Sequence, residues 1–130
     1  MTQAKRPLSP HLSIYRPQIS SVLSIGNRIT GLALYAGSAV MVLWLWSAAY
    51  APEFYTTLHD CLASVFGKVL LLGWTVAFYF HLLCGIRHLI WDTGRGMSVP
   101  AVNKSGIAAV VLTFILTAFT WGVAISAGVQ

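Results

Sequence analysis

The residues of this chain that could do chemistry lie near the end of a long apolar stretch. His81 lies in the uncharged segment between Lys68 and Arg87, and Gly85 and His88 follow it four and seven residues later. At 3.6 residues per turn, His81, Gly85 and His88 share one face of a helix. Imidazole is a common metal ligand, and a glycine one turn away lets a flat macrocycle approach the backbone. This pattern favours His81 as an axial ligand of a haem iron.

A simpler interpretation of His81 stays open: a hydrogen bond to a neighbouring helix, or a place in a small hydrated cavity. An unpartnered ionisable group at that depth costs on the order of 3 kcal/mol. His88 cannot be the second axial ligand, because it projects from the same side of the helix, about 10.5 Å further along its axis. It fits better beside a haem propionate, with Arg28 or Arg87 adding positive charge, or in an interfacial polar cluster with Asp92.

The other two histidines, His11 and His59, lie outside the apolar segment that holds His81. A second protein ligand to the same iron must therefore come from another chain, so the sequence predicts obligatory assembly. Two other functions remain as alternatives: a structural anchor that binds no cofactor, and a small proton channel in which His81 and Asp92 form a relay. The channel is disfavoured because transporters typically use more helices and internal repeats.

A second group of polar residues stands at the start of the first apolar run, in SSVLSIGNRITG. Ser24 and Arg28 are four residues apart and share a helix face. A hydroxyl and a guanidinium at the membrane edge could hydrogen-bond the carbonyl oxygens of a quinone. The alternative is a helix-capping serine and an arginine that only sets membrane orientation.

The elements that must position these residues are membrane helices. The chain has 130 residues, enough for one domain, with 8% charged and 57% hydrophobic residues and a mean hydropathy of +0.74. So small a soluble domain could not bury that much apolar surface, so the lipid bilayer must surround most side chains. The net charge of +5 comes from basic residues at the ends of apolar runs, which favours anionic headgroups over nucleic acid as their partner.

The sequence predicts an all-α integral membrane protein with three transmembrane helices, at about residues 26–50, 65–92 and 105–129, forming part of a heteromeric helical bundle. Residues 1–23 are interpreted as a cytoplasmic tail, neither signal nor transit peptide, which favours a bacterial inner membrane over a mitochondrial one. The first loop, with Glu53, His59 and Asp60, has no Lys or Arg before Lys68. The positive-inside rule therefore places the N-terminus and second loop in the cytoplasm. The basic residues behind this orientation are Lys5, Arg6, Arg16, Arg28, Arg87, Arg95 and Lys104.

Together these stretches resemble the cytochrome b556 membrane-anchor subunits of succinate dehydrogenase, the succinate:quinone oxidoreductase of respiratory complex II. The resemblance covers nearly the whole chain, from RPLSPHLSIY through Ser24, Arg28 and Thr30 to HLLCGIRHLIWDTG. It implies that His81 is an axial ligand of haem b, shared with a second small anchor subunit. It further implies that Ser24 and Arg28 contact ubiquinone, with Arg28 also near the haem propionates.

The resemblance also implies partners and a role. A flavoprotein subunit and an iron–sulfur subunit would dock on the anchor, and electrons would pass from succinate to ubiquinone in the tricarboxylic acid cycle and respiratory chain. The chain alone is not expected to be active. One position departs from the family pattern, because a histidine usually precedes the arginine and this chain has Asn27. Asparagine can still donate a hydrogen bond, but it cannot titrate.

Overall fold

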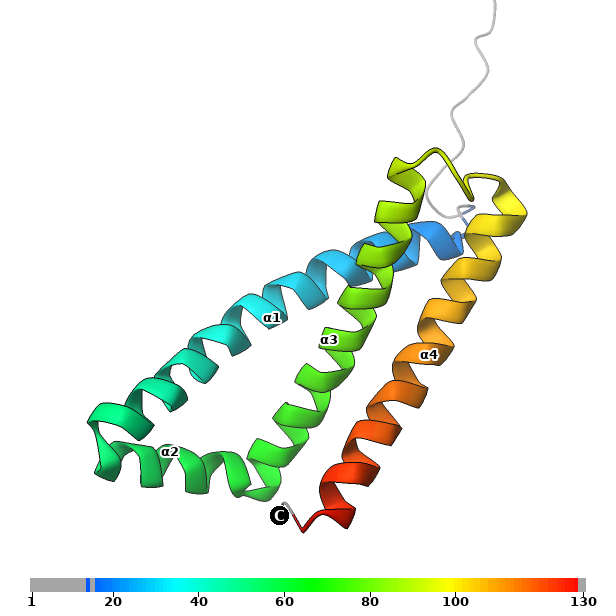
Figure 1. The fold of residues 1–130 in the computed structure, drawn as a ribbon. Helices are drawn as coiled ribbons and strands as arrows, with labels where there is room; N and C mark the ends of the chain where they lie inside the picture. Colours follow the sequence, from blue (N-terminus) through cyan, green and yellow to red (C-terminus); the bar gives the residue numbers. More distant parts are fainter. Residues whose placement is uncertain (1–13, 15, 129–130) are drawn as a thin grey trace, which may run out of the picture.

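The computed structural model describes residue 14 and residues 16–128, and nearly all of this part of the chain is helical. Its elements are α1 Ile19–Tyr50, α2 Pro52–Ala63, α3 Val65–Asp92 and α4 Val99–Ser126, shown in Figure 1. Three of them, α1, α3 and α4, are long and apolar enough to cross a membrane. The predicted all-α fold with three transmembrane helices is confirmed.

Local sequence explains where the helices start and stop. Proline disfavours helical backbone in the residue before it, and Ala51 leaves the helical region with φ −145° and ψ 71°, so α1 ends before Pro52. Ser64 caps α3, because its Oγ accepts a hydrogen bond from the Gly67 main-chain N–H at 3.1 Å. After α3 the chain turns at Gly94, whose φ of +77° is readily adopted only by glycine.

Two of the spanning helices begin earlier than predicted. α1 starts at Ile19 rather than near residue 26, and α4 starts at Val99 rather than near residue 105 and ends at Ser126. The expected tail therefore includes the first turn of α1, while residues 1–13 lie outside the described residues. The predicted bounds followed the apolar runs, which mark what hydrocarbon covers. A helix can continue past that limit into the polar headgroup region, where water satisfies its terminal groups.

The predicted outer loop forms a helix, α2. Pro52 at its first position and Glu53 in its first turn are both favourable at a helix N-terminus. Tyr55, Leu58 and Leu62 are half-buried at a spacing of three to four residues, so one stripe of α2 packs against the rest of the chain. This helix is too short to span a bilayer, and it lies across the end of the molecule between α1 and α3.

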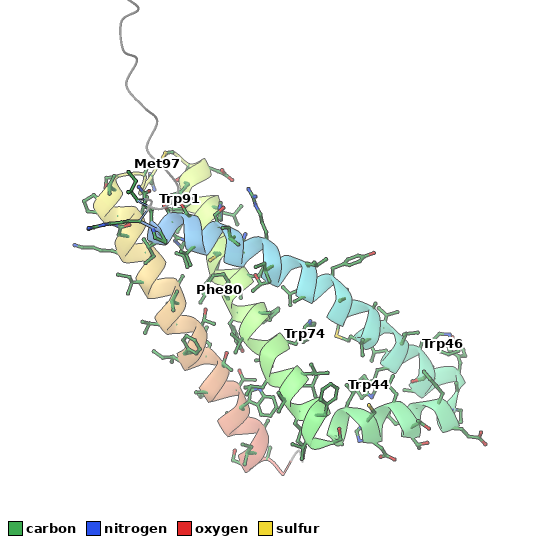
Figure 2. The ribbon with its side chains drawn as sticks, turned by 180° about the vertical axis from the view of Figure 1, so that it is seen from behind. Trp44, Trp46, Trp74, Phe80, Trp91 and Met97 are labelled. Carbon is green, nitrogen blue, oxygen red and sulfur yellow. The ribbon has the colours of Figure 1, made fainter. Side chains whose placement is uncertain are left out.

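The three long helices are not parallel (Figure 1). α3 and α4 run antiparallel side by side, whereas α1 contacts α3 through its N-terminal half and then diverges. Glycines allow this contact, because an added Cβ would lie 3.1 Å from the Phe80 ring at Gly26 and would overlap the Trp74 indole at Gly37. Figure 2 shows Trp74 between the two helices. The start of α1 and the turn between α3 and α4 lie at one end of the molecule, opposite α2.

Few side chains are buried within the described part of the chain. Large apolar side chains are exposed along every long helix, for example Leu32 at 71% and Phe119 at 68%. In water such surfaces would drive aggregation, so lipid or other membrane helices must cover them. The buried side chains lie where α1, α3 and α4 meet each other and α2, and they are mostly small: Leu23, Ser47, Ala77, Cys84, Arg87, Ala109, Thr113 and Thr117.

Candidate functional site

His81 lies on α3, and its imidazole ring is directed at α1. The ring Nδ1 lies 3.0 Å from the main-chain oxygen of Asn27 and 3.4 Å from the Oγ1 of Thr30. A carbonyl oxygen can only accept a hydrogen bond, so Nδ1 carries the proton and donates it to Asn27. In a neutral ring the lone pair is then on Nε2. The hydrogen-bonded alternative for His81 is therefore observed, and it leaves Nε2 available to a metal.

Two glycines shape the space around His81. At Gly31 on α1, an added Cβ would lie 3.0 Å from the ring Cε1, so the ring occupies the room that this glycine leaves. At Gly85, one turn after His81 on α3, an added Cβ would meet nothing within 4 Å. The sequence predicted that Gly85 opens the backbone to a flat group, and the structure has open space at that position.

His88 lies near the end of α3 and is exposed. Its Nδ1 lies 2.6 Å from the main-chain oxygen of Cys84, and its ring packs edge-on against Trp91 with centroids 5.1 Å apart. Nδ1 must be the donor here too, so in a neutral ring Nε2 carries the lone pair and can accept a hydrogen bond. Within the described ranges no group of three or more His, Cys, Asp or Glu side chains could hold a metal ion.

Arg87, which the sequence left open as a source of positive charge near the haem propionates, contacts α4. Its side chain is buried and bound to α4: Nε donates to Ser105 Oγ at 3.1 Å and Nη2 donates to the Val102 main-chain oxygen at 3.2 Å. The guanidinium also lies over the Trp91 ring, 4.7 Å from the centroid. An added Cβ at Gly106 would approach Nη2 to 3.5 Å. Arg87 therefore joins α3 to α4.

Ser24 and Arg28 lie one turn apart on α1, and both are exposed. In the part of the chain that the structure describes, neither side chain makes a hydrogen bond or an ion pair. Asn27, directly before Arg28, has a buried Oδ1 without a hydrogen-bond partner. An unmatched buried acceptor is costly unless something outside the chain satisfies it. The start of α1 thus offers free donors on Ser24 and Arg28 and a free acceptor on Asn27.

The sequence alone does not indicate a role for Gly31 or for the main-chain oxygen of Asn27, and Thr30 is singled out in it only as part of a motif. A main-chain carbonyl cannot be recognised in the sequence, because every residue type has one. A weaker signal was present: Gly26, Thr30 and Gly37 are small residues at spacings of four and seven, which is typical of a face that contacts another membrane helix. Of the remaining histidines, His59 stacks on Tyr55 in α2, with centroids 5.6 Å apart, and His11 lies outside the described residues.

Comparisons with known proteins bear on this geometry. A family model described as succinate dehydrogenase/fumarate reductase transmembrane subunit matches residues 2–120. A succinate dehydrogenase cytochrome b556 subunit of Rickettsia typhi is 44% identical over 117 residues, covering 90% of this chain and 91% of the relative. The subunit of the same name from Paracoccus denitrificans is 36% identical over 120 residues, covering 92% of each chain.

The similarity extends to mitochondria. The mitochondrial succinate dehydrogenase cytochrome b560 subunit of Sus scrofa is 36% identical over 117 residues, covering 86% of this chain and 68% of the relative. Each match includes the start of α1 or the end of α3 within a nearly full-length alignment. The resemblance identified from the motifs around Arg28 and His81 is confirmed.

Proposed function

The chain belongs to the succinate dehydrogenase/fumarate reductase transmembrane subunit family, and from that premise we propose that it is the haem b-binding anchor of a succinate:quinone oxidoreductase. Its bacterial relatives and its three apolar helices make it a multi-pass protein of the bacterial inner membrane. In this proposal the chain is not active alone. It docks an iron–sulfur subunit and a flavoprotein subunit, which oxidises succinate, and forms part of the quinone site.

The observation that carries the haem assignment is the hydrogen bond from His81 Nδ1 to the Asn27 main-chain oxygen, at 3.0 Å. Metal-bound histidines in proteins commonly donate their second ring N–H to a carbonyl in this way, which fixes the tautomer and the ring orientation. The open space at Gly85 gives a flat porphyrin access to the same helix face. The residues present therefore fit a haem b with His81 Nε2 as an axial ligand.

The rest of the haem site is divided between this chain and a partner. A bound haem b would supply a one-electron carrier. Arg28 and His88 lie on α1 and α3 toward the basic end of the molecule, where the Arg28 guanidinium would neutralise a propionate and His88 would lie beside one. The second axial ligand would come from a second small anchor subunit. In the described part of the chain, His81 and His88 are the histidines in spanning helices, and both belong to α3.

Quinone binding is assigned to the exposed pair on α1. The Ser24 hydroxyl and the Arg28 guanidinium have free donors, and a ubiquinone carbonyl oxygen is an acceptor. As two electrons and two protons convert the quinone to a quinol, negative charge develops on its oxygens. Arg28 would stabilise that charge without reorganising, because a guanidinium stays protonated. The electrons would arrive from succinate through the flavoprotein and iron–sulfur subunits.

The haem assignment is tested by reduced-minus-oxidised spectra of the purified complex. We expect a b-type α-band in the wild type and its loss in His81→Leu, because leucine removes the ring nitrogen that this chain would supply to the iron. Gly85→Leu is expected to lose the band as well, since its side chain would fill the space needed by the porphyrin. Gly73→Leu is the matched control, because Gly73 also lies on α3 and an added Cβ there would meet nothing within 4 Å.

Two results would contradict the assignment. If the wild-type complex had no b-type spectrum, the remaining function would be that of a structural anchor that binds no haem. A spectrum that survives in His81→Leu with an unchanged α-band would place the haem on other residues. His59→Leu, a change at the opposite end of the molecule, should leave the spectrum as it is.

A further inference from the structure

Three polar atoms meet where the imidazole of His81 touches α1. The ring Nδ1 lies 3.0 Å from the Asn27 main-chain oxygen and 3.4 Å from Thr30 Oγ1. The two oxygens are themselves 3.0 Å apart. Thr30 Oγ1 also lies 2.9 Å from the main-chain oxygen of Gly26, one turn earlier on the same helix. Only two protons, one on the ring and one on the hydroxyl, are available for these contacts.

One arrangement of the two protons satisfies both contacts of the ring nitrogen, and it leaves the contact between Thr30 Oγ1 and the Asn27 oxygen without a proton of its own. The 3.0 Å contact between Nδ1 and the Asn27 oxygen needs a proton, and only the ring can supply it. Nδ1 therefore cannot accept from the Thr30 hydroxyl. The hydroxyl donates instead to the Gly26 oxygen, its shortest contact, and turns a lone pair toward the ring. The ring proton is then shared between a close carbonyl and a more distant hydroxyl oxygen.

We propose that Thr30 is a positioning residue for His81, with its hydroxyl acting as the second acceptor of the ring Nδ1 proton and so raising the electron donation of Nε2 to iron. The inference rests on the proposed function, because it concerns the haem ligand named there. Hydrogen bonds from the far nitrogen of a ligating histidine make the ring a stronger base. A more basic ligand favours ferric over ferrous iron, so the hydroxyl lowers the reduction potential of the haem.

Gly31 contacts the His81 ring on a second side. A Cβ at this position would lie 3.0 Å from Cε1, 3.5 Å from Nδ1 and 3.9 Å from Nε2, so the ring edge rests against the glycine backbone. The ring is thereby held on two sides: by oxygens at Nδ1 and by the main chain at Cε1. Because the contacts all come from one turn of α1, this helix sets both the orientation of the imidazole and the acceptor strength at Nδ1.

The inference is tested by potentiometric titration of the haem in the purified complex. Thr30→Val keeps the shape of the side chain and removes the hydroxyl. We expect it to increase the ratio of reduced to oxidised haem at a fixed potential by roughly two- to tenfold, where tenfold equals a rise of about 59 mV for one electron. Thr30→Ser restores the hydroxyl and should return the ratio to the wild-type value.

Thr113→Val is the matched control. Thr113 is a buried threonine on α4 whose hydroxyl also donates to a main-chain oxygen one turn earlier, that of Ala109 at 2.8 Å. It makes no contact with His81, so its change should leave the haem potential as in the wild type. An equal shift in Thr113→Val and Thr30→Val would mean a general packing effect and would overturn the inference.

The outcomes separate this inference from the proposed function. A wild-type complex with a haem spectrum that depends on His81, together with an unchanged potential in Thr30→Val, would overturn the role of Thr30 alone. Loss of the haem in Thr30→Val together with its retention in Thr30→Ser would support the inference, because it would mean that haem binding needs the hydroxyl. Absence of haem from the wild-type complex would instead contradict the proposed function.

Discussion

His81 and Arg87 stand six residues apart on α3, and both could carry charge inside or near the membrane, yet they are used differently. Arg87 is buried, and two of its nitrogens are bound to α4. His81 uses one nitrogen to bind α1 and keeps the other, with open space at Gly85 nearby. A membrane-embedded polar side chain that is fully satisfied holds helices together, whereas one with a remaining lone pair can also bind a ligand.

At this scale the sequence singled out candidate residues, but it did not predict which atoms they contact. The depth of His81 in an apolar run and the spacing to Gly85 were sufficient to single out both. The partner of His81 was not predictable, because the acceptor is the main-chain oxygen of Asn27 and any residue type would supply one. The contacts of Arg87 with Ser105 and Val102 were not predictable either, since side-chain direction depends on where α4 packs.

The exposed hydroxyl of Ser24 gives a prediction about the quinone. Ser24→Ala removes one hydrogen bond, on the order of 1 kcal/mol, and should raise the KM for ubiquinone roughly fivefold while leaving electron transfer from succinate to a soluble dye intact. The measurement compares both activities in the same membranes. Ser38→Ala is the control, because the Ser38 hydroxyl on α1 donates to the Tyr35 main-chain oxygen at 2.8 Å. An unchanged KM would remove Ser24 from the quinone site.

Among the elements, α3 carries the contacts that define the fold. It meets α1 where glycines leave room for Trp74 and Phe80, and it meets α4 through Arg87 and through hydrogen bonds of Tyr79 to Thr120 and of Trp121 to Thr75. Membrane helices gain little from burying apolar surface against each other, so close backbone approach and hydrogen bonds must hold them. α1 diverges from α3 after Gly37, and its second half makes no side-chain hydrogen bond to α4.

Hydropathy predicted the three spans because each is a long uncharged run, but it did not predict helix ends or α2. Other residues carried signals for those features: Ser64 caps α3, Pro52 is the first residue of α2, and Pro100 is the second residue of α4. The crossing of α1 over α3 could not be predicted, since it depends on which glycine meets which aromatic side chain.

Arg87→Met tests the connection between α3 and α4. Methionine fills similar volume and stays apolar, but it loses the hydrogen bonds to Ser105 and Val102 and the contact with Trp91. We expect a loss of about 1–3 kcal/mol in stability, seen as a lower midpoint in thermal unfolding of the detergent-solubilised complex. Arg95→Met, at an exposed position in the turn after α3, should leave the midpoint unchanged. Equal midpoints for Arg87→Met and the wild type would mean that the connection contributes nothing.

The molecule as a whole has two chemically distinct ends. The start of α1 and the turn between α3 and α4 form one end, and the described basic residues there far outnumber its one acidic residue, Asp92. The other end is covered by α2, which carries Glu53 and Asp60. The candidate quinone residues lie near the basic end. In the proposed function, an iron–sulfur partner on the cytoplasmic side would therefore dock close to the quinone that receives its electrons.

This asymmetry predicts the orientation of the chain, and a native cysteine can report it. Cys61 is exposed in α2, whereas Cys84 is fully buried in α3. A membrane-impermeant maleimide should therefore modify Cys61 in intact spheroplasts and not in inverted vesicles, because the positive-inside rule places α2 outside. Cys61→Ser should abolish the signal, which shows that Cys84 does not contribute. Modification only in inverted vesicles would show the opposite orientation, and it would place the basic end away from the side on which we propose that the soluble subunits dock.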